Sequence, residues 1–126
     1  MNVMSVSAIT ITSPNPEQLA AFYRQRLGIV LEAASHGAMK RHFEGWIGEP
    51  ERGGVHFAVL KGRAGAAEAG GPAPTFRVRG IEACVAELEQ AGTALVHRVA
   101  DLGEGKRLAS FRDPDGNVFR LIDLGF

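Results

Sequence analysis

The sequence has almost no cysteine, no excess of charge of either sign and no long apolar run, and each absence excludes a class of protein. Cys84 is its single cysteine, so an intrachain disulfide and a multi-cysteine metal site are excluded. The 14 basic residues balance the 14 acidic ones, whereas nucleic-acid and membrane-surface binding need a basic excess. No apolar stretch approaches membrane-spanning length. We therefore expect neither a nucleic-acid partner nor a membrane partner.

The composition that remains is typical of a soluble globular domain. The 126 residues are 45% hydrophobic and 22% charged, and this length is enough to bury a core. Residues 1–5 lack a basic region followed by an apolar run, so we expect no signal peptide and a cytoplasmic location.

The first half predicts the order strand, helix, strand, strand, strand. Residues 6–12 alternate as a half-buried strand does. Asn15 and Pro16 are typical of a helix start, and Gly28 is typical of a helix end. The further strands are expected at residues 29–34, 39–46 and 55–61.

The second half repeats this order after a segment rich in glycine, alanine and proline, residues 62–74, which we interpret as a linker. A strand at residues 75–79 precedes a helix between Gly80 and Gly92. Strands are then expected at residues 96–102, 107–112 and 118–122. The chain therefore divides into module 1 (about 1–61) and module 2 (about 75–126), each with the order βαβββ.

Three motifs carry a resemblance to a known family. They are residues 9–12 leading into the helix that ends Phe22-Tyr23…Leu27-Gly28, the second helix (78–92), and Asp113-Pro114-Asp115-Gly116-Asn117 with the strand that follows. Together they resemble the vicinal oxygen chelate superfamily, which includes glyoxalase I, extradiol dioxygenases, and bleomycin- and fosfomycin-resistance proteins. The resemblance implies an α+β fold in which two βαβββ modules form an open, eight-stranded, barrel-like cleft within a single domain, 1–126. It also implies a homodimer.

The resemblance implies four positions for a divalent metal, and this sequence fills them poorly. They map to Ala8, to Ala73 by an offset of 65 residues between the modules, to His56 and to Arg120. Methyl groups cannot ligate and a guanidinium repels a cation, whereas a metal needs several N or O ligands that converge. We therefore expect no metal, no cofactor and no glyoxalase or dioxygenase chemistry by the usual metal route, and we name no catalytic residue.

The same mapping indicates which strand residues face the cleft and which lie beneath the helices. It places Thr10, His56, Arg77 and Arg120 in the cleft. Each arginine is a candidate to bind a carboxylate or phosphate, because a guanidinium pairs with such groups through a planar fork. The alternative is that both arginines pair internally, with Glu32, Glu44 or Asp123.

Two aromatic residues complete the candidate set. Trp46 and Phe43 are expected to form an aromatic wall for a flat ligand. The candidate ligand-binding residues are therefore Arg120, Arg77, His56, Thr10, Trp46 and Phe43.

The remaining chemistry-bearing residues favour structural roles. The histidines at 36, 42 and 97 stand alone without ligand spacing, so we expect them to be exposed or hydrogen-bonded. Cys84 is expected to be a small buried apolar residue. Asp113 and Asp115 are expected to accept hydrogen bonds from turn backbone N–H groups.

Three functions remain open at this point. The first is a metal-free protein, similar to the bleomycin-resistance branch, that binds an anionic or aromatic small molecule. The second is a divalent-metal-dependent lyase, isomerase or dioxygenase. The third is a protein with a vestigial cleft that acts through a partner chain. The missing ligands favour the first, and the ligand itself cannot be read from the residues.

Overall fold

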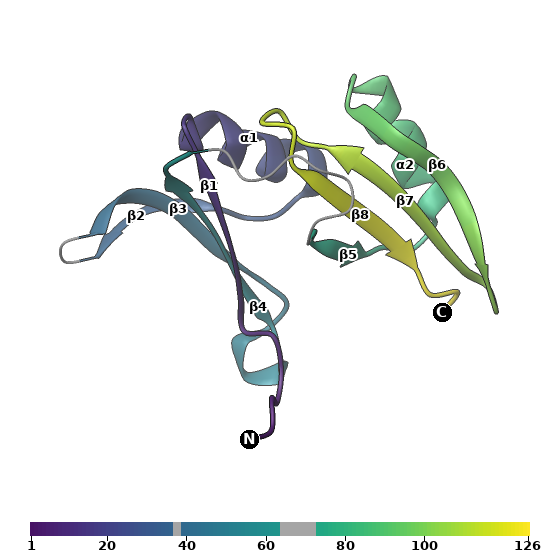
Figure 1. Cartoon of the computed structure of the whole chain (residues 1–126), viewed down its shortest axis with the longest axis horizontal. Coiled ribbons are helices and arrows are strands. Elements are labelled where there is room, and N and C mark those ends of the chain that lie inside the picture. Colours follow the sequence, from purple (N-terminus) through teal and green to yellow (C-terminus); the bar gives the residue numbers. More distant parts are fainter. Residues whose placement is uncertain (37–38, 64–72) are drawn as a thin grey trace. The chain divides into compact units, whose positions relative to one another are not determined.

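The structure is a computed structural model that describes residues 1–36, 39–63 and 73–126. The chain divides into two compact units, Met1–Gly65 and Ala66–Phe126. Each unit has the order βαβββ, with one helix and a four-stranded sheet (Figure 1). This confirms the α+β class and the two βαβββ modules. Most of the expected linker (62–74) lies outside the described residues, and the single domain with its module boundaries stays a prediction.

Unit 1 is built from a mixed sheet and helix α1. Its strands have the order β1-β4-β3-β2; β1 runs parallel to β4, and the other neighbours are antiparallel. The elements are β1 (Ala8–Ser13), α1 (Pro16–Leu27), β2 (Glu32–His36), β3 (Met39–Ile47), the 3-10 turn η1 (Pro50–Arg52) and β4 (Val55–Lys61).

Helix α1 begins and ends where its sequence signals predict. Pro16 opens it, and Gly28 closes it in the left-handed conformation, with φ of 70°, which glycine adopts without strain. The backbone N–H of Ile29 then donates to the Tyr23 carbonyl (3.2 Å). Because this bond belongs to the helix end, β2 begins at Glu32 and not at residue 29 as expected. Tyr23 is fully buried against Phe57, with ring centroids 5.1 Å apart.

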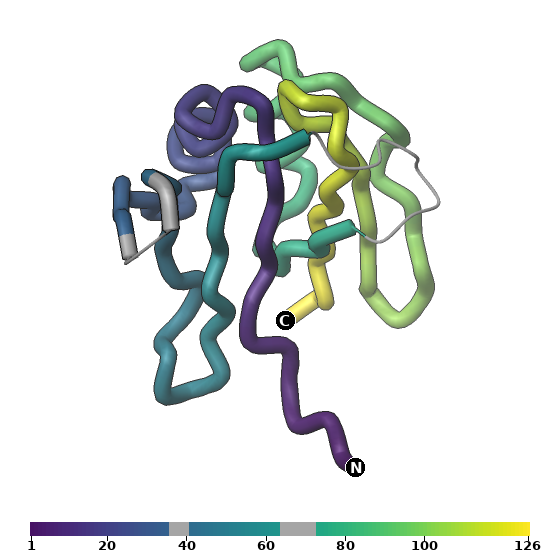
Figure 2. Tube along the Cα trace, turned by 60° about the vertical axis from the view of Figure 1, so that its left-hand side comes forward, coloured from purple at the N-terminus to yellow at the C-terminus, as the bar shows by residue number. Residues whose placement is uncertain are grey.

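Unit 2 repeats the topology with the order β5-β8-β7-β6, in which β5 runs parallel to β8 (Figure 2). Phe111 stacks on Phe119 at 5.8 Å in its core, beneath helix α2. The elements are β5 (Thr75–Arg77), α2 (Ile81–Gln90), β6 (Ala94–Gly103), β7 (Lys106–Arg112) and β8 (Val118–Asp123).

Two aspartates hold the ends of β8. Asp113 accepts hydrogen bonds from the backbone N–H groups of Asp115 (2.9 Å) and Asn117 (3.0 Å), as expected for this turn. Asp123 accepts from the N–H groups of Gly80 (3.0 Å) and Ile81 (3.3 Å). Since Gly80 has no side chain, Asp123 supplies from β8 the acceptor that the start of α2 lacks.

Candidate functional site

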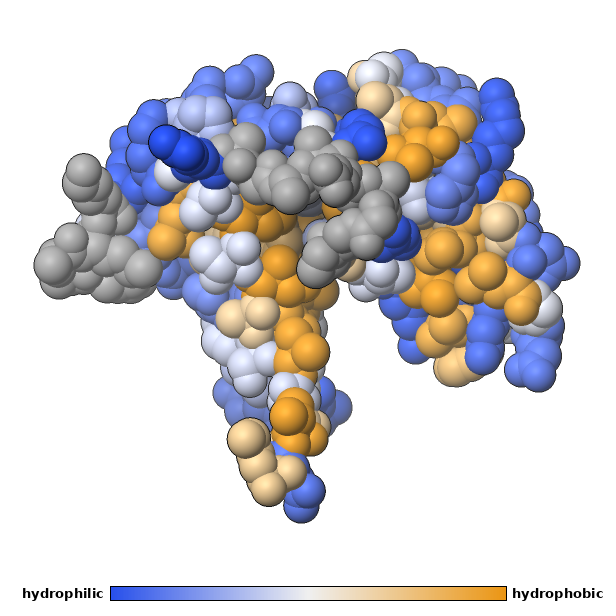
Figure 3. Space-filling view, viewed as in Figure 1, coloured by the Kyte–Doolittle hydropathy of each residue, from blue (hydrophilic) through white to orange (hydrophobic). Residues whose placement is uncertain are grey.

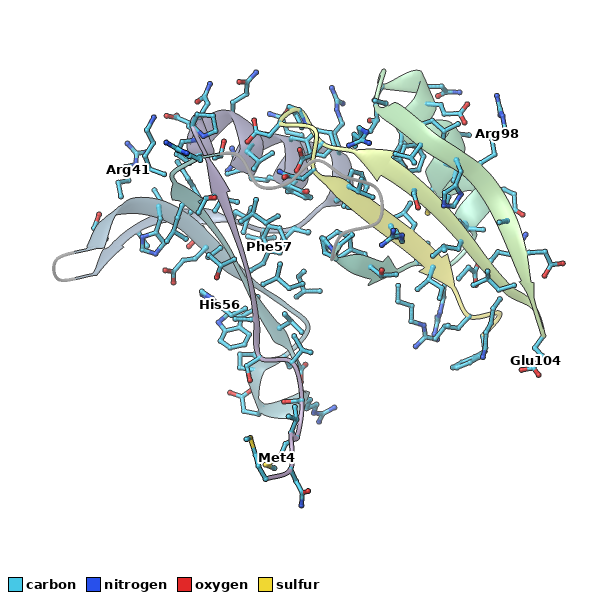
Figure 4. All side chains as sticks on the ribbon, in the orientation of Figure 1. Met4, Arg41, His56, Phe57, Arg98 and Glu104 are labelled. Carbon is cyan, nitrogen blue, oxygen red and sulfur yellow. The ribbon has the colours of Figure 1, made fainter. Side chains whose placement is uncertain are left out.

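Each sheet has one face under its helix and one face without a helix of its own unit, which we call the open face. In unit 1 the register aligns Ile9 with Phe57 and Ile11 with Val59 on the helix face. It aligns Ala8 with His56 and Thr10 with Ala58 on the open face. His56 and Phe57 are consecutive on β4 and therefore point to opposite faces (Figure 4). This register agrees with the predicted partition of the strand residues.

An aromatic pair lies on the open face of unit 1. Trp46 of β3 is directly opposite His56 of β4, and their rings pack edge to face with centroids 5.2 Å apart. The indole is 47% exposed even though it belongs to a regular strand. The neighbouring strand positions carry the short side chains of Ala8 and Ala58, which leave the ring accessible.

A carboxylate lies beside this pair. One oxygen of Glu44 is 2.5 Å from Nε2 of the buried His42, and the other is 3.6 Å from Nε2 of His56. Glu32 of β2 is directly opposite Glu44. The sequence interpretation treated His42 as isolated, although residues 42, 44 and 46 share one face by the period of two and could have been grouped.

The prediction that Trp46 and Phe43 form one aromatic wall is wrong, because the two side chains lie on opposite faces of the unit 1 sheet. Phe43 is opposite Val59 and belongs to the helix face, where it is 7% exposed. Phe43 and Trp46 are three positions apart, and an odd difference in position along a strand puts two side chains on opposite faces. The Arg41 guanidinium lies over the Phe43 ring, 5.5 Å from its centroid. Phe43 and Arg41 line a hollow of about 310 Å³ together with Pro14, Asn15, Pro16, Glu17 and Lys61.

The open face of unit 2 carries the two candidate arginines. Arg120 of β8 lies between Thr75 of β5 and Ser110 of β7 in the register. Arg77 donates to the backbone oxygen of Phe126, and its guanidinium lies 4.7 Å from the centroid of that ring.

Asp123 is not the internal partner of these arginines. It is on the helix face, where its carboxylate is 3.6 Å from the Arg107 guanidinium. The pKa of Asp123 lies below its usual range, chiefly because the carboxylate accepts the Gly125 N–H, and the Ile81 and Gly80 N–H groups and Arg107 add to this. The pairing of Arg77 or Arg120 with Glu32 or Glu44 stays a prediction.

His97 and Ser110 form a pair that the sequence interpretation missed. Ser110 Oγ is 2.6 Å from His97 Nε2. The register of β6 against β7 shifts on both sides of His97, which moves His97 off the face of Leu95 and onto the open face. A bulge of this kind leaves no reliable signal in the residue pattern.

The residues at the implied metal positions do not fit a divalent metal. Ala8 and His56 are neighbours in unit 1, but only the imidazole can ligate. In unit 2 the residue opposite Arg120 is Thr75 and not Ala73, because β5 begins two residues after the position given by the offset. Within residues 1–36, 39–63 and 73–126, no group of three or more His, Cys, Asp or Glu side chains is arranged to hold a metal.

Cys84 is placed as a structural residue. It is partly buried, and its Sγ donates to the Arg79 carbonyl at 3.6 Å. Burial raises the pKa of the thiol, and Glu87 and Asp123 raise it further. A thiol held in its protonated form is a poor nucleophile.

Comparisons with solved structures place this fold among known ones. UcmS2 is 26% identical, with a TM-score of 0.71 over 97% of this chain and 98% of that chain. TnmS3, described as an antibiotic binding protein from Streptomyces sp. CB03234, is 22% identical, with a TM-score of 0.68 over 98% of each chain. A glyoxylase/bleomycin resistance protein/dioxygenase domain from Frankia sp. EAN1pec is 18% identical, with a TM-score of 0.72 over 96% of this chain and 98% of that chain.

Comparisons of sequence give the family. No curated protein matches the chain. The family model of the glyoxalase-like domain matches residues 8–122, which span every strand and both helices except the last residue of β8. The chain therefore belongs to the glyoxalase-like domain family, within the vicinal oxygen chelate superfamily.

Proposed function

We propose that this protein binds small organic molecules without a metal and holds them without chemical change. The open face of unit 1 takes a flat aromatic ring, and the open face of unit 2 takes an anionic group. The observation that carries the proposal is the half-exposed indole of Trp46, held edge-on by His56 at 5.2 Å.

The Trp46 indole is suited to a ring because it is both fixed and accessible. A large aromatic side chain left in water on a sheet face loses the free energy that its burial would give. A flat ligand that covers the indole recovers that free energy and adds a stacking contact. Glu44 and His56 offer an acceptor and a second polar contact beside the ring, which favours a ligand with a hydroxyl or amino substituent.

Arg120 and Arg77 support the anionic half of the proposal. They share the open face of unit 2 with the hydroxyl residues Thr75 and Ser110. A guanidinium with hydroxyl donors beside it recognises a carboxylate or phosphate through charge-assisted hydrogen bonds. The likeness to TnmS3, which is described as an antibiotic binding protein, supports small-molecule binding in this fold.

A thermal-shift screen of aromatic carboxylates, hydroxylated aromatics and neutral aromatics tests the proposal, since a ligand that binds only the folded state raises Tm. We expect hits among the aromatic compounds, which the open face of unit 1 takes, and among the carboxylates, which the open face of unit 2 takes. Trp46→Leu should weaken the aromatic hits about tenfold or more, and Arg120→Gln should weaken the carboxylate hits to a similar degree. Leu102→Ala, which changes an exposed apolar residue of β6, should leave both kinds of hit unchanged. A screen without any hit, or hits indifferent to Trp46 and Arg120, would overturn the proposal and favour a vestigial cleft.

Metal analysis of the purified protein separates this function from a metal-dependent lyase, isomerase or dioxygenase. His56 is the only one of the implied positions with a ligating side chain of the usual kind, so we expect no stoichiometric divalent metal. One metal per chain that disappears in His56→Ala would favour the enzyme instead.

A further inference from the structure

The hollow beside the start of α1 belongs to neither open face and has no role in the proposed function. Pro14 and Pro16 line it from the turn between β1 and α1, while Arg41 lines it from β3 and Lys61 from the end of β4. All of these segments belong to unit 1, and Figure 4 places Arg41 at this end of the sheet. The hollow measures about 310 Å³, which is enough for a small organic molecule.

Two cations meet at this hollow. In β3 and β4, Phe43 is opposite Val59. Continued by two positions, the same antiparallel register brings Arg41 of β3 to Lys61 of β4, on the helix face. Like charges that are directly opposite on a sheet repel each other and destabilise it. Both side chains are exposed, so an anion from solvent can reach them and offset that repulsion.

Neutral groups hold the two cations in place. The Arg41 guanidinium lies 5.5 Å from the centroid of the Phe43 ring, and the Lys61 ammonium donates to the Pro14 carbonyl. Among the residues that the structure describes, no carboxylate lies within ion-pair distance of either cation. A guanidinium has five donor hydrogens and an ammonium has three, so these contacts leave donors for a ligand.

The rest of the lining indicates the kind of ligand. Glu17 is the one carboxylate among the lining residues, so the two cations outnumber it. Pro14 and Pro16 give the hollow an apolar surface. The planar Arg41 guanidinium, which the Phe43 ring supports, adds a surface on which an aromatic ring can stack. A matching ligand therefore joins an anionic group to a small aromatic body.

We propose that this hollow is a second binding site, which takes a small aryl phosphate ester with its phosphate group between Arg41 and Lys61. A phosphate monoester carries nearly two negative charges and has three terminal oxygens, so it can pair with both cations at once. A carboxylate has one charge and two oxygens, and it pairs with them less well. The inference does not rest on the proposed function, because the hollow shares no residue with the sites of Trp46 and Arg120.

Mapping of amide chemical shifts by NMR with phenyl phosphate at about pH 8 tests the proposal, since each backbone N–H reports on its own surroundings. We expect saturable shifts of the amides of Asn15, Glu17 and Lys61, which line the hollow. Inorganic phosphate lacks the ring, and benzoate lacks the second charge. Each should therefore shift the same amides with an affinity that is weaker by about fivefold or more.

Variants of the charged lining residues separate binding from a structural role. Arg41→Gln and Lys61→Gln should each weaken phenyl phosphate about tenfold, since a hydrogen bond between charged groups is lost. Glu17→Gln should instead tighten it about threefold, because a carboxylate that repels the phosphate is removed. A purely structural role of Glu17 would not produce this gain. Arg52→Gln is the matched control: Arg52 is an exposed cation of unit 1 that pairs with Glu49 at 3.2 Å, and its replacement should leave the affinity unchanged.

Three results would overturn the inference. They are the absence of saturable shifts at the hollow with millimolar phenyl phosphate, equal affinity for inorganic phosphate, and unchanged affinity in Arg41→Gln and Lys61→Gln. Phenyl phosphate that shifts only amides of unit 2 would also overturn it, while supporting the anionic face proposed there. Arg120→Gln should leave the shifts at the hollow unchanged, so this inference and the proposed function fail independently.

Discussion

At the scale of single residues, Asp123 shows how one side chain can complete an element that is distant in the chain. Gly80 precedes α2 and has no side chain to cap it, and the carboxylate that accepts the first helical N–H groups comes from the end of β8. The same carboxylate contacts Arg107, which also pairs with Glu82 of α2. One residue therefore ties helix, strand and following loop together.

Replacement of Asp123 by asparagine should lower stability, and the loss should depend on pH. The pKa of Asp123 is lowered in the folded state, so its contribution is complete above the ordinary carboxyl pKa of about 4 and is lost as the pH falls through the lowered value. Urea unfolding at pH 7 should show the wild type clearly more stable than Asp123→Asn. This difference should shrink below about pH 4. A difference that stays constant down to pH 2.5 would contradict the account.

At the scale of elements, the close approach of β3 to the segment before β2 depends on Gly45. A Cβ at this position would lie 1.9 Å from the Val30 carbonyl oxygen, which real side chains do not tolerate. The backbone of one segment would have to move, and the register of β3 against β4 would move with it. The position of Trp46 in the sheet therefore depends on the absence of a side chain at the neighbouring Gly45.

Gly45→Ala should destabilise the protein by about 3 kcal/mol or more, because backbone atoms and not a flexible side chain stand in the way. Gly53→Ala is the matched control. Its Cβ would meet open space, so it should cost only about 1 kcal/mol for the left-handed backbone with φ of 79°. Chemical denaturation of both variants measures the two costs, and equal losses would show that the approach at Val30 is unimportant.

The elements also show how far the sequence could be interpreted. Helix α1 and strand β4 were predictable because caps and short-range patterns define them locally. The period of two placed Thr10, His56 and Arg120 on the open faces. The same period of two, applied to β3, puts Phe43 and Trp46 on opposite faces of the sheet.

Other features depend on contacts that no local pattern carries. The start of β2 is set by a hydrogen bond to the end of α1, and the face of His97 is set by bulges in β6. Strand β5 begins two residues later than the offset of 65 from β1 predicts. Thr75 and not Ala73 is therefore opposite Arg120. These are pairings between distant segments, and they decide which side chains share an open face.

At the scale of the whole molecule, membership of the glyoxalase-like family gives the fold but not the chemistry, since one fold supports several functions. In the part of the chain that the structure describes, no helix is long and apolar enough to cross a membrane.

Apolar side chains in the segment before β1 are exposed (Figure 3), namely Met1, Val3, Met4 and Val6.

We propose that the chain forms a homodimer, as the family resemblance implies. Sedimentation equilibrium at micromolar concentration should give twice the chain mass of 13.4 kDa. Val3→Ser and Met4→Ser should leave this mass unchanged if the exposed segment is free in the dimer, and should lower it if the segment is part of the interface. A wild-type mass equal to one chain would contradict the proposal.

The most direct test of the central claim uses the single tryptophan of the chain. Because Trp46 is half exposed beside His56, an aromatic ligand that covers it must change the indole emission in a saturable way. We predict that titration with an aromatic hit that Trp46→Leu weakens gives a fluorescence Kd equal to the calorimetric Kd. Calorimetric binding of that ligand with unchanged Trp46 emission would show that the ring site lies elsewhere.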